Sequence, residues 1–166
     1  MEKIKKENLI FIVEDDTIYR EIIKNELHEN GYKNIQIFSS GQECIDNLYQ
    51  IPEVVLLDYN LEGRINGHEA LRKIKANNPD IQVVMLSGQE KLEVAITSLK
   101  YGAFDYVIKN DVAINRVGKT VNRIVKWNEI IEENKRMKKA KTHAFVVIGV
   151  VLSAIITFSM IYPKFF

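Results

Sequence analysis

The chain has 166 residues, which leaves room for one α/β domain and a short appendage but not for a second globular output domain. Its 23 basic and 22 acidic residues are unevenly spread. Residues 132–141 hold five basic and two acidic residues and residues 142–166 hold one basic residue, so residues 1–131 carry a net charge of −3. That balance argues against a nucleic-acid-binding surface, and the lone Cys44 excludes an intrachain disulfide and suits a reducing compartment.

Short apolar runs alternate with helical patterns along the first 110 residues. The expected strands are residues 9–13, 35–38, 54–57, 81–86 and 104–108, and the expected helices lie around 18–27, 41–49, 70–74, 92–101 and onward from about 111. Runs without polar interruption are typical of parallel strands covered on both faces. The pattern predicts an α/β fold: a flavodoxin-like, doubly wound, five-stranded parallel sheet in the order 2-1-3-4-5. Its site is expected at the carboxyl ends of the strands, beside the switch point between strands one and three.

Polar residues follow the expected strands at that edge. These residues are Glu14, Asp15 and Asp16 after strand one, Asp58 after strand three, Ser87 after strand four and Lys109 after strand five. Clustered carboxylates repel one another unless a hard cation such as Mg²⁺ neutralises them. Asp58 stands alone at its strand end, so it is the candidate nucleophile for an aspartyl phosphate, with Lys109 and Ser87 contacting the phosphoryl oxygens. The alternative for the three adjacent acids is a solvated helix N-terminus, which the helix dipole favours.

Four ordered motifs resemble the response-regulator receiver family over about residues 8–125: IFIVEDD at 10–16, VVLLD at 54–58, VMLSG at 84–88 and GAFDYVIK at 102–109. The resemblance implies the following roles: Glu14 and Asp15 as the acidic pair, Asp58 as the phosphoacceptor, Ser87 and Tyr106 as the switch hydroxyl and aromatic, and Lys109 as the family's lysine. It also implies that Mg²⁺ binds Glu14, Asp15, Asp58 and the carbonyl of Asn60. Asn60 and Gln89 occupy the positions where family members tune the lifetime of the phosphoaspartate.

The sequence departs from the family's pattern in two places. Asn110 follows Lys109 where the family usually has a proline, often after a cis peptide bond. A non-proline cis bond costs ~3–4 kcal/mol, so we expect a trans or strained loop here. The loop at residues 61–67 lacks the common proline and is one residue longer, which affects the rim of the site more than its chemistry.

The last helical pattern continues past the expected sheet. Ile114, Val117, Val121, Ile124 and Ile131 recur at heptad spacing, with Asn128 in the same register. Packing on the sheet explains the first part. For the extension past about Lys126 two alternatives stand: a solvated connector, or a short parallel homodimer in which Asn128 sets the register.

Residues 144–162 contain no charge, and at ~1.5 Å per residue a helix of this length spans nearly the ~30 Å hydrocarbon core of a bilayer. They predict a transmembrane helix; a buried core helix is the alternative, but the domain offers no second core to receive it. The basic cluster at 135–141 places the domain side in the cytoplasm and can attract anionic lipid headgroups. We therefore expect a receiver at 1–131, a basic juxtamembrane linker at 132–143, a span at 144–162 and a non-cytoplasmic tail at 163–166, in a single-pass protein of the bacterial inner membrane.

The predicted function is a signalling receiver and not an enzyme, apart from self-catalysed phosphorylation and dephosphorylation. A histidine kinase or phosphotransfer protein donates a phosphoryl group to Asp58, and a protein-interaction surface at the membrane then switches; no nucleic-acid partner is expected. One alternative is a pseudo-receiver, a membrane-tethered interaction module that is not phosphorylated, which only Asn110 supports. A metal-dependent phosphohydrolase is the other, and it is disfavoured because Asn60 stands where such enzymes need a second acid.

Overall fold

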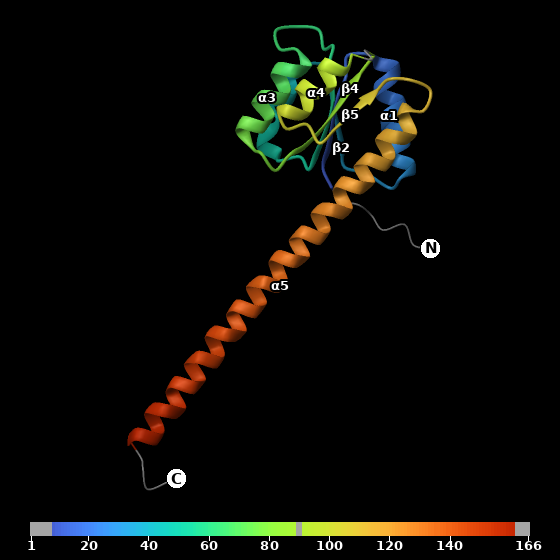
Figure 1. The fold of residues 1–166 in the computed structure, drawn as a ribbon. Helices are drawn as coiled ribbons and strands as arrows, with labels where there is room; N and C mark the ends of the chain where they lie inside the picture. The colour runs from blue at the N-terminus through green and yellow to red at the C-terminus, as the bar shows by residue number, and fades with distance from the viewer. Residues whose placement is uncertain (1–7, 89–90, 162–166) are drawn as a thin grey trace. The chain divides into compact units, whose positions relative to one another are not determined.

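The computed structural model describes residues 8–88 and 91–161 (Figure 1). Its strands are β1 (Ile10–Val13), β2 (Ile35–Phe38), β3 (Val54–Asp58), β4 (Gln82–Ser87) and β5 (Asp105–Ile108). Its helices are α1 (Thr17–Glu29), α2 (Gly41–Asp46), the 3₁₀ helix η1 (Leu48–Gln50), α3 (Gly67–Asn77), α4 (Leu92–Lys100) and α5 (Ala113–Ile161). The predicted alternation of strands and helices is confirmed. The helix expected at 41–49 is divided at Asn47, whose N–H donates to the carbonyl of Cys44 three residues back, so the chain tightens into a 3₁₀ turn.

All five strands are parallel and follow the order β2-β1-β3-β4-β5, as predicted. In β1, Ile10 lies opposite Ile35 of β2 on one side and Val54 of β3 on the other. β1 and β3 are buried along their whole length, which explains why their sequences are continuous apolar runs. The order reverses between β1 and β3, so the switch point lies between the ends of these two strands.

Helices cover both faces of the sheet, and each face has its own core. On one face Phe11, Val55 and Met85 pack against α2 and α3, including Cys44 and Leu71. On the other face alternate strand residues such as Ile12 and Leu56 pack against α1 and the beginning of α5. This double cover fixes the strand ends relative to one another, which is what a site assembled from several strands requires.

The packed part of α5 ends at Val125. The buried apolar side chains of α5 are Ala113, Val117, Val121, Ile124 and Val125. The first compact unit is residues 1–125 and the second begins at Lys126. The predicted packing of the early heptad positions agrees with this burial, whereas the boundaries at 131, 143 and 162 stay predictions.

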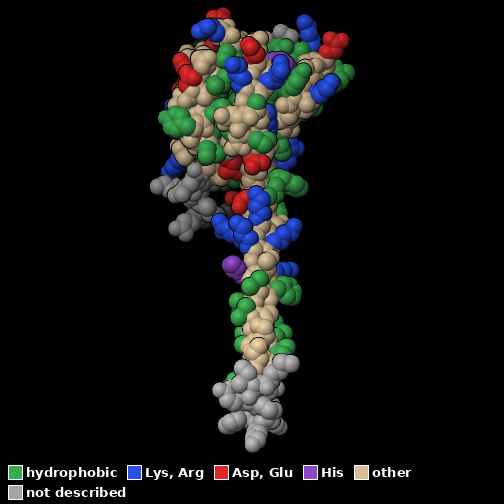
Figure 2. All heavy atoms as spheres, turned by 90° about the vertical axis from the view of Figure 1, so that its left-hand side faces the viewer, with side chains coloured by type: hydrophobic (Ala, Val, Ile, Leu, Met, Phe, Trp, Pro, Cys, Tyr) green, Lys and Arg blue, Asp and Glu red, His purple; other side chains and the backbone are tan. Residues whose placement is uncertain are grey.

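The second unit is a helical segment whose described side chains are exposed except for the half-buried Asn128. Within α5 the most apolar 18-residue window has a mean hydropathy of 1.9 and none of it is buried, so the helix is long and apolar enough to cross a membrane. Lys and Arg side chains gather on the helix before the apolar stretch (Figure 2). Tyr162, the last residue of the predicted span, and the predicted tail at 163–166 lie outside the described residues.

Candidate functional site

The parallel sheet brings the predicted polar residues to one edge. Glu14 directly follows β1, and Asp58 and Ser87 are the last residues of β3 and β4. Lys109 directly follows β5, whose last residue, Ile108, pairs with Ser87. Since parallel strands end on the same side of a sheet, four neighbouring strands deliver these groups to a single edge.

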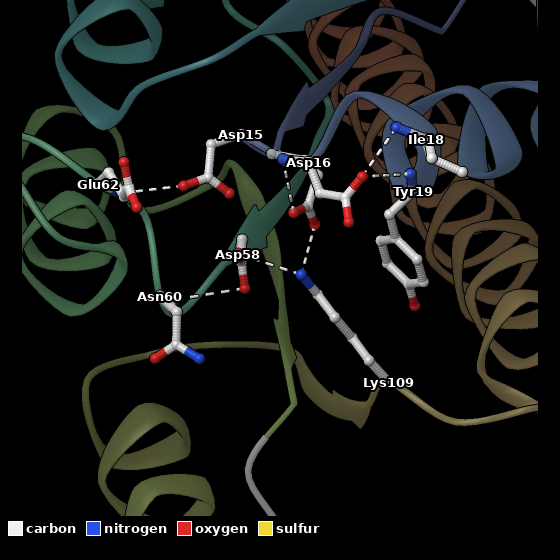
Figure 3. Close-up of polar contacts among 9 residues, drawn as sticks. Asp15, Asp16, Ile18, Tyr19, Asp58, Asn60, Glu62 and Lys109 are labelled. Atoms are coloured by element: carbon white, nitrogen blue, oxygen red, sulfur yellow. Dashed lines mark hydrogen bonds and ion pairs between the residues drawn. The ribbon is translucent and has the colours of Figure 1, made fainter.

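Three carboxylates meet there. Glu14, Asp15 and Asp58 each offer a carboxylate oxygen, and these oxygens lie within 4.8 Å of one another. Glu14 is fully buried and Asp58 is 3% exposed, whereas Asp15 lies closer to solvent. Figure 3 shows Asp15 and Asp58 facing the space between the ends of β1 and β3.

Lys109 supplies positive charge next to these carboxylates. The Nζ of Lys109 lies 2.6 Å from Oε2 of Glu14 and 3.1 Å from Oδ2 of Asp58 (Figure 3). The same Nζ lies 4.7 Å from the ring centroid of Tyr19, a cation–π contact. With one cation among three carboxylates, the site keeps an excess of negative charge.

Burial raises the pKa of Glu14 to about 7, and the neighbouring Asp58 carboxylate acts in the same direction, while the bond from Lys109 opposes both. Burial, together with Glu14 and Asp58, also raises the pKa of Tyr19 to about 12. These shifts are the response expected of acids held together in a partly buried site with too little positive charge. A cluster of carboxylate oxygens is the ligand type that Mg²⁺ prefers, so the residues present fit such an ion.

Asp16, the third acid after β1, has a different structural role. Asp16 caps the N-terminus of α1, where its Oδ1 accepts hydrogen bonds from the N–H groups of Ile18 at 2.8 Å and Tyr19 at 3.1 Å. These two bonds lower the pKa of the Asp16 carboxyl. The helix-cap interpretation therefore applies to Asp16, while Glu14 and Asp15 belong to the cluster. Asp15 accepts from the N–H of Glu62 at 3.2 Å, which ties the loop after β3 to the acidic pair.

The other predicted site residues surround this cluster. The N–H of Asn60 donates to Oδ1 of Asp58 at 3.3 Å. Ser87 is buried, and its carbonyl accepts the N–H of Lys109 at 2.8 Å, so the end of β4 holds the residue that carries the cation. Tyr106 is 7% exposed within β5, and Gln89 lies outside the described residues. The roles assigned to these residues stay predictions.

The backbone after Lys109 has one of its expected forms, whereas one contact of Lys109 was not predicted. The described residues contain no cis peptide bond, so the Lys109–Asn110 peptide is trans, one of the two expected forms, and Lys109 still reaches the cluster. The residue missed by the sequence analysis is Tyr19, which contacts Lys109 from the first turn of α1. Its position four residues after Asp15, at the start of the helix that leaves the acidic strand end, was the available signal.

Comparison with known proteins decides the family. The profile of the response regulator receiver domain matches residues 10–121. The chain belongs to this family. The receiver domain of NtrX from Brucella abortus has a similar structure, with a TM-score of 0.65, 26% sequence identity and coverage of 70% of this chain and 98% of that one. A CheY-like receiver domain protein from Methanospirillum hungatei gives a TM-score of 0.65 at 25% identity, over 74% of this chain and 97% of the other.

The curated relatives of this receiver are longer proteins. The transcriptional regulatory protein ZraR of Escherichia coli is 34% identical over 101 residues, which cover 60% of this chain and 22% of ZraR. The transcriptional regulatory protein MalR of Bacillus subtilis is 35% identical over 102 residues, covering 60% of this chain and 43% of MalR. The chain spans less than half the length of these relatives, and the matched family profile ends within the first part of α5.

Proposed function

We propose that this chain is a membrane-tethered response-regulator receiver that accepts a phosphoryl group on Asp58 from a histidine kinase or a phosphotransfer protein. The observation that carries the proposal is the position of Asp58, whose carboxylate lies beside the acidic pair and 3.1 Å from the Nζ of Lys109. A carboxylate held in this way is oriented for attack on phosphorus, and positioning with charge neutralisation is most of what phosphoryl transfer needs.

The chain's own groups account for each requirement of the transfer. An oxygen of Asp58 forms the new bond to phosphorus as the bond to the donor breaks. Lys109 neutralises charge on the transferred oxygens, and the hydroxyl of Ser87, at the buried end of β4, donates a hydrogen bond to one of them. Neither role requires a group that the site lacks.

Glu14, Asp15, Asp58 and the carbonyl of Asn60 are the groups that would hold Mg²⁺. Bound there, the ion supplies positive charge that offsets the carboxylates and the phosphoryl oxygens. The grouping of three carboxylate oxygens within 4.8 Å of one another supports this part of the proposal, because a hard cation is what such a group binds. Asn60 and Gln89 are proposed to set the lifetime of the phosphoaspartate.

Phosphorylation is proposed to switch a surface read by a partner protein. The phosphoryl group adds about −1.5 to −2 charge next to Ser87, which draws the hydroxyl inward. Tyr106, buried in the neighbouring strand, follows into the space that opens, so the face formed by α4, β5 and the start of α5 changes. Output is then a protein interaction at the membrane and not chemistry on a substrate.

The membrane tether rests on α5. Its apolar side chains between Phe145 and Phe158 are exposed, and exposing an apolar helix of this length to water is energetically unfavourable. The adjoining basic segment at 135–141 supports insertion with the receiver in the cytoplasm. Resistance of the chain to carbonate extraction from membranes, with the receiver open to protease from the cytoplasmic side only, tests this part.

Incubation of the purified full chain with Mg²⁺ and acetyl phosphate, followed by intact-mass analysis, tests the phosphoacceptor. We expect one phosphoryl adduct on the wild type and on Asp46→Asn, a control that alters an exposed acid of α2, and none on Asp58→Asn. An adduct on Asp58→Asn at the wild-type level contradicts the assignment. No adduct on any of the three, with no binding of Mg²⁺, favours the pseudo-receiver.

A further inference from the structure

The helix beyond the receiver carries a second apolar stripe, distinct from the one that packs on the sheet. Trp127, Ile130 and Met137 are 59%, 45% and 50% exposed, and their spacing with Asn134 alternates by three and four residues. This is the a and d pattern of a coiled coil, with Trp127 and Asn134 at a and Ile130 and Met137 at d. Lys141 and Ala144 occupy the next a and d positions, and beyond them the same register passes through Ile148, Val151, Ile155 and Phe158, all exposed.

The register suggested by Asn128 fails on the same helix. Val117, Val121 and Ile124 of that register are buried against the sheet, so a second helix cannot use them. Beyond Ile131 the register reaches Lys135 and Lys138, which are exposed cations at positions that a dimer core would bury. The stripe containing Trp127 lies one position earlier along the chain. None of its four residues is buried against the sheet, and it reaches its first core cation only at Lys141, one heptad beyond Asn134.

We propose that the stripe of Trp127, Ile130, Asn134 and Met137 is the core of a parallel, two-stranded coiled coil with a second copy of this chain. The partner is a second copy because the charged residues that flank the stripe on one chain are complementary to those on an identical chain. Glu133 falls at position g and Lys138 at the following e, the two positions that face each other across a parallel dimer. Two symmetric pairs, Glu133 of each chain with Lys138 of the other, therefore flank the core.

Asn134 selects the same arrangement. A single asparagine at position a favours two strands in register, because each amide pairs with its counterpart instead of facing an apolar side chain. Its Nδ2 donates to the carbonyl of Ile130 at 2.9 Å, so the side chain lies along the stripe. The parallel direction rests on the proposed function, since two copies inserted in one membrane with their receivers in the cytoplasm point the same way.

Disulfide mapping of the full chain in its membrane tests the proposal. On a Cys44→Ala background, which removes the only native thiol, single cysteines replace Asn134 and Met137 of the core and, as matched exposed controls, Glu132 and Lys139 at position f. Under mild oxidation we expect several-fold more cross-linked dimer at 134 and 137 than at 132 and 139. In an antiparallel pair a residue faces the same residue of the other chain at only one height along the helix. Strong cross-linking at both 134 and 137 therefore also shows that the two helices are parallel.

Charge reversal supplies the second arm. Glu133→Lys should lower the dimerisation constant by roughly fivefold, since two exposed pairs are worth about 1 kcal/mol together, and Lys138→Glu should do the same. The double variant should restore dimerisation. Equal linkage at core and control positions, linkage centred on 128 and 135, or no rescue in the double variant overturns the proposal. Carbonate extraction of the same membranes tests the tether separately, and phosphoryl uptake on Asp58 depends on neither result.

Discussion

Gly67 makes a very tight backbone contact with Asp58, the proposed phosphoacceptor. It is the first residue of α3, and a Cβ built on it would lie 2.0 Å from the carbonyl oxygen of Asp58 and 2.7 Å from Cα of Tyr59. Its N–H donates to the carbonyl of Tyr59 at 3.2 Å, so the helix begins directly against the end of β3. All the opposing atoms belong to the backbone, so no side-chain rotamer can relieve a Gly67→Ala substitution.

The contact must open from 2.0 Å to at least 3.0 Å before the methyl group fits. Overpacking of this kind costs about 1–3 kcal/mol, and a rigid backbone partner places Gly67→Ala at the upper end. The better helix propensity of alanine offsets less than about 1 kcal/mol at a first-turn position. We therefore expect a net loss of about 2–3 kcal/mol in the free energy of unfolding, or roughly 10 °C in Tm.

Circular dichroism melts of the full chain in one detergent provide the assay, with Gly88→Ala as the matched control. A Cβ at Gly88 meets nothing within 4 Å and its φ is not positive, so this variant should stay within about 0.5 kcal/mol of the wild type. Phosphoryl uptake should slow in Gly67→Ala alone, because the end of β3 has to shift. Equal melting temperatures for the two variants would refute the close approach of α3 to Asp58.

The remaining predictions concern the metal ligands and the buried thiol. Mg²⁺ at ten times its Kd should raise the free energy of unfolding of the wild type by about 1.4 kcal/mol, and Asp15→Asn should lose most of that gain in a thermal-shift titration; an undiminished gain contradicts a role for Asp15 as ligand. Burial raises the pKa of Cys44 to about 12, so at pH 8 only about one folded molecule in ten thousand carries the reactive thiolate. Thiol labelling at pH 8 should therefore be slow until urea unfolds the receiver, and fast labelling of the native chain would contradict this burial.

The sheet was predictable because burial on both faces leaves a simple trace in the sequence. Strands such as Val54–Asp58 are apolar at every position until the polar residue at the end, and parallel order then brings these ends together. That logic alone predicts Glu14, Asp58 and Lys109 at one edge of the sheet, where the structure also places them.

Other features depended on information that spacing does not contain. Asp15 and Asp16 are identical acids one position apart, yet the backbone turn into α1 directs one to the cluster and the other to the helix cap. Tyr19 contacts Lys109 because the first turn of α1 begins at the same end of the sheet where Lys109 follows β5. The exposed stripe of α5 is offset by one position in the sequence from the register of the stripe that packs on the sheet. Only the burial of the side chains in the structure distinguishes the two stripes.

The charges of the site also suggest how a phosphoryl group would be felt outside it. The Nζ of Lys109 lies 2.6 Å from Glu14 and 3.1 Å from Asp58, so its closer partner is not the proposed phosphoacceptor. When Asp58 gains a phosphoryl group, the added group carries a charge of about −1.5 to −2, so the attraction of Lys109 to position 58 grows relative to its attraction to Glu14. The backbone N–H of Lys109 is bonded to the carbonyl of Ser87, so this shift also bears on the end of β4. The strand that carries the proposed switch hydroxyl is thus linked to the phosphoacceptor by the same residue that neutralises it.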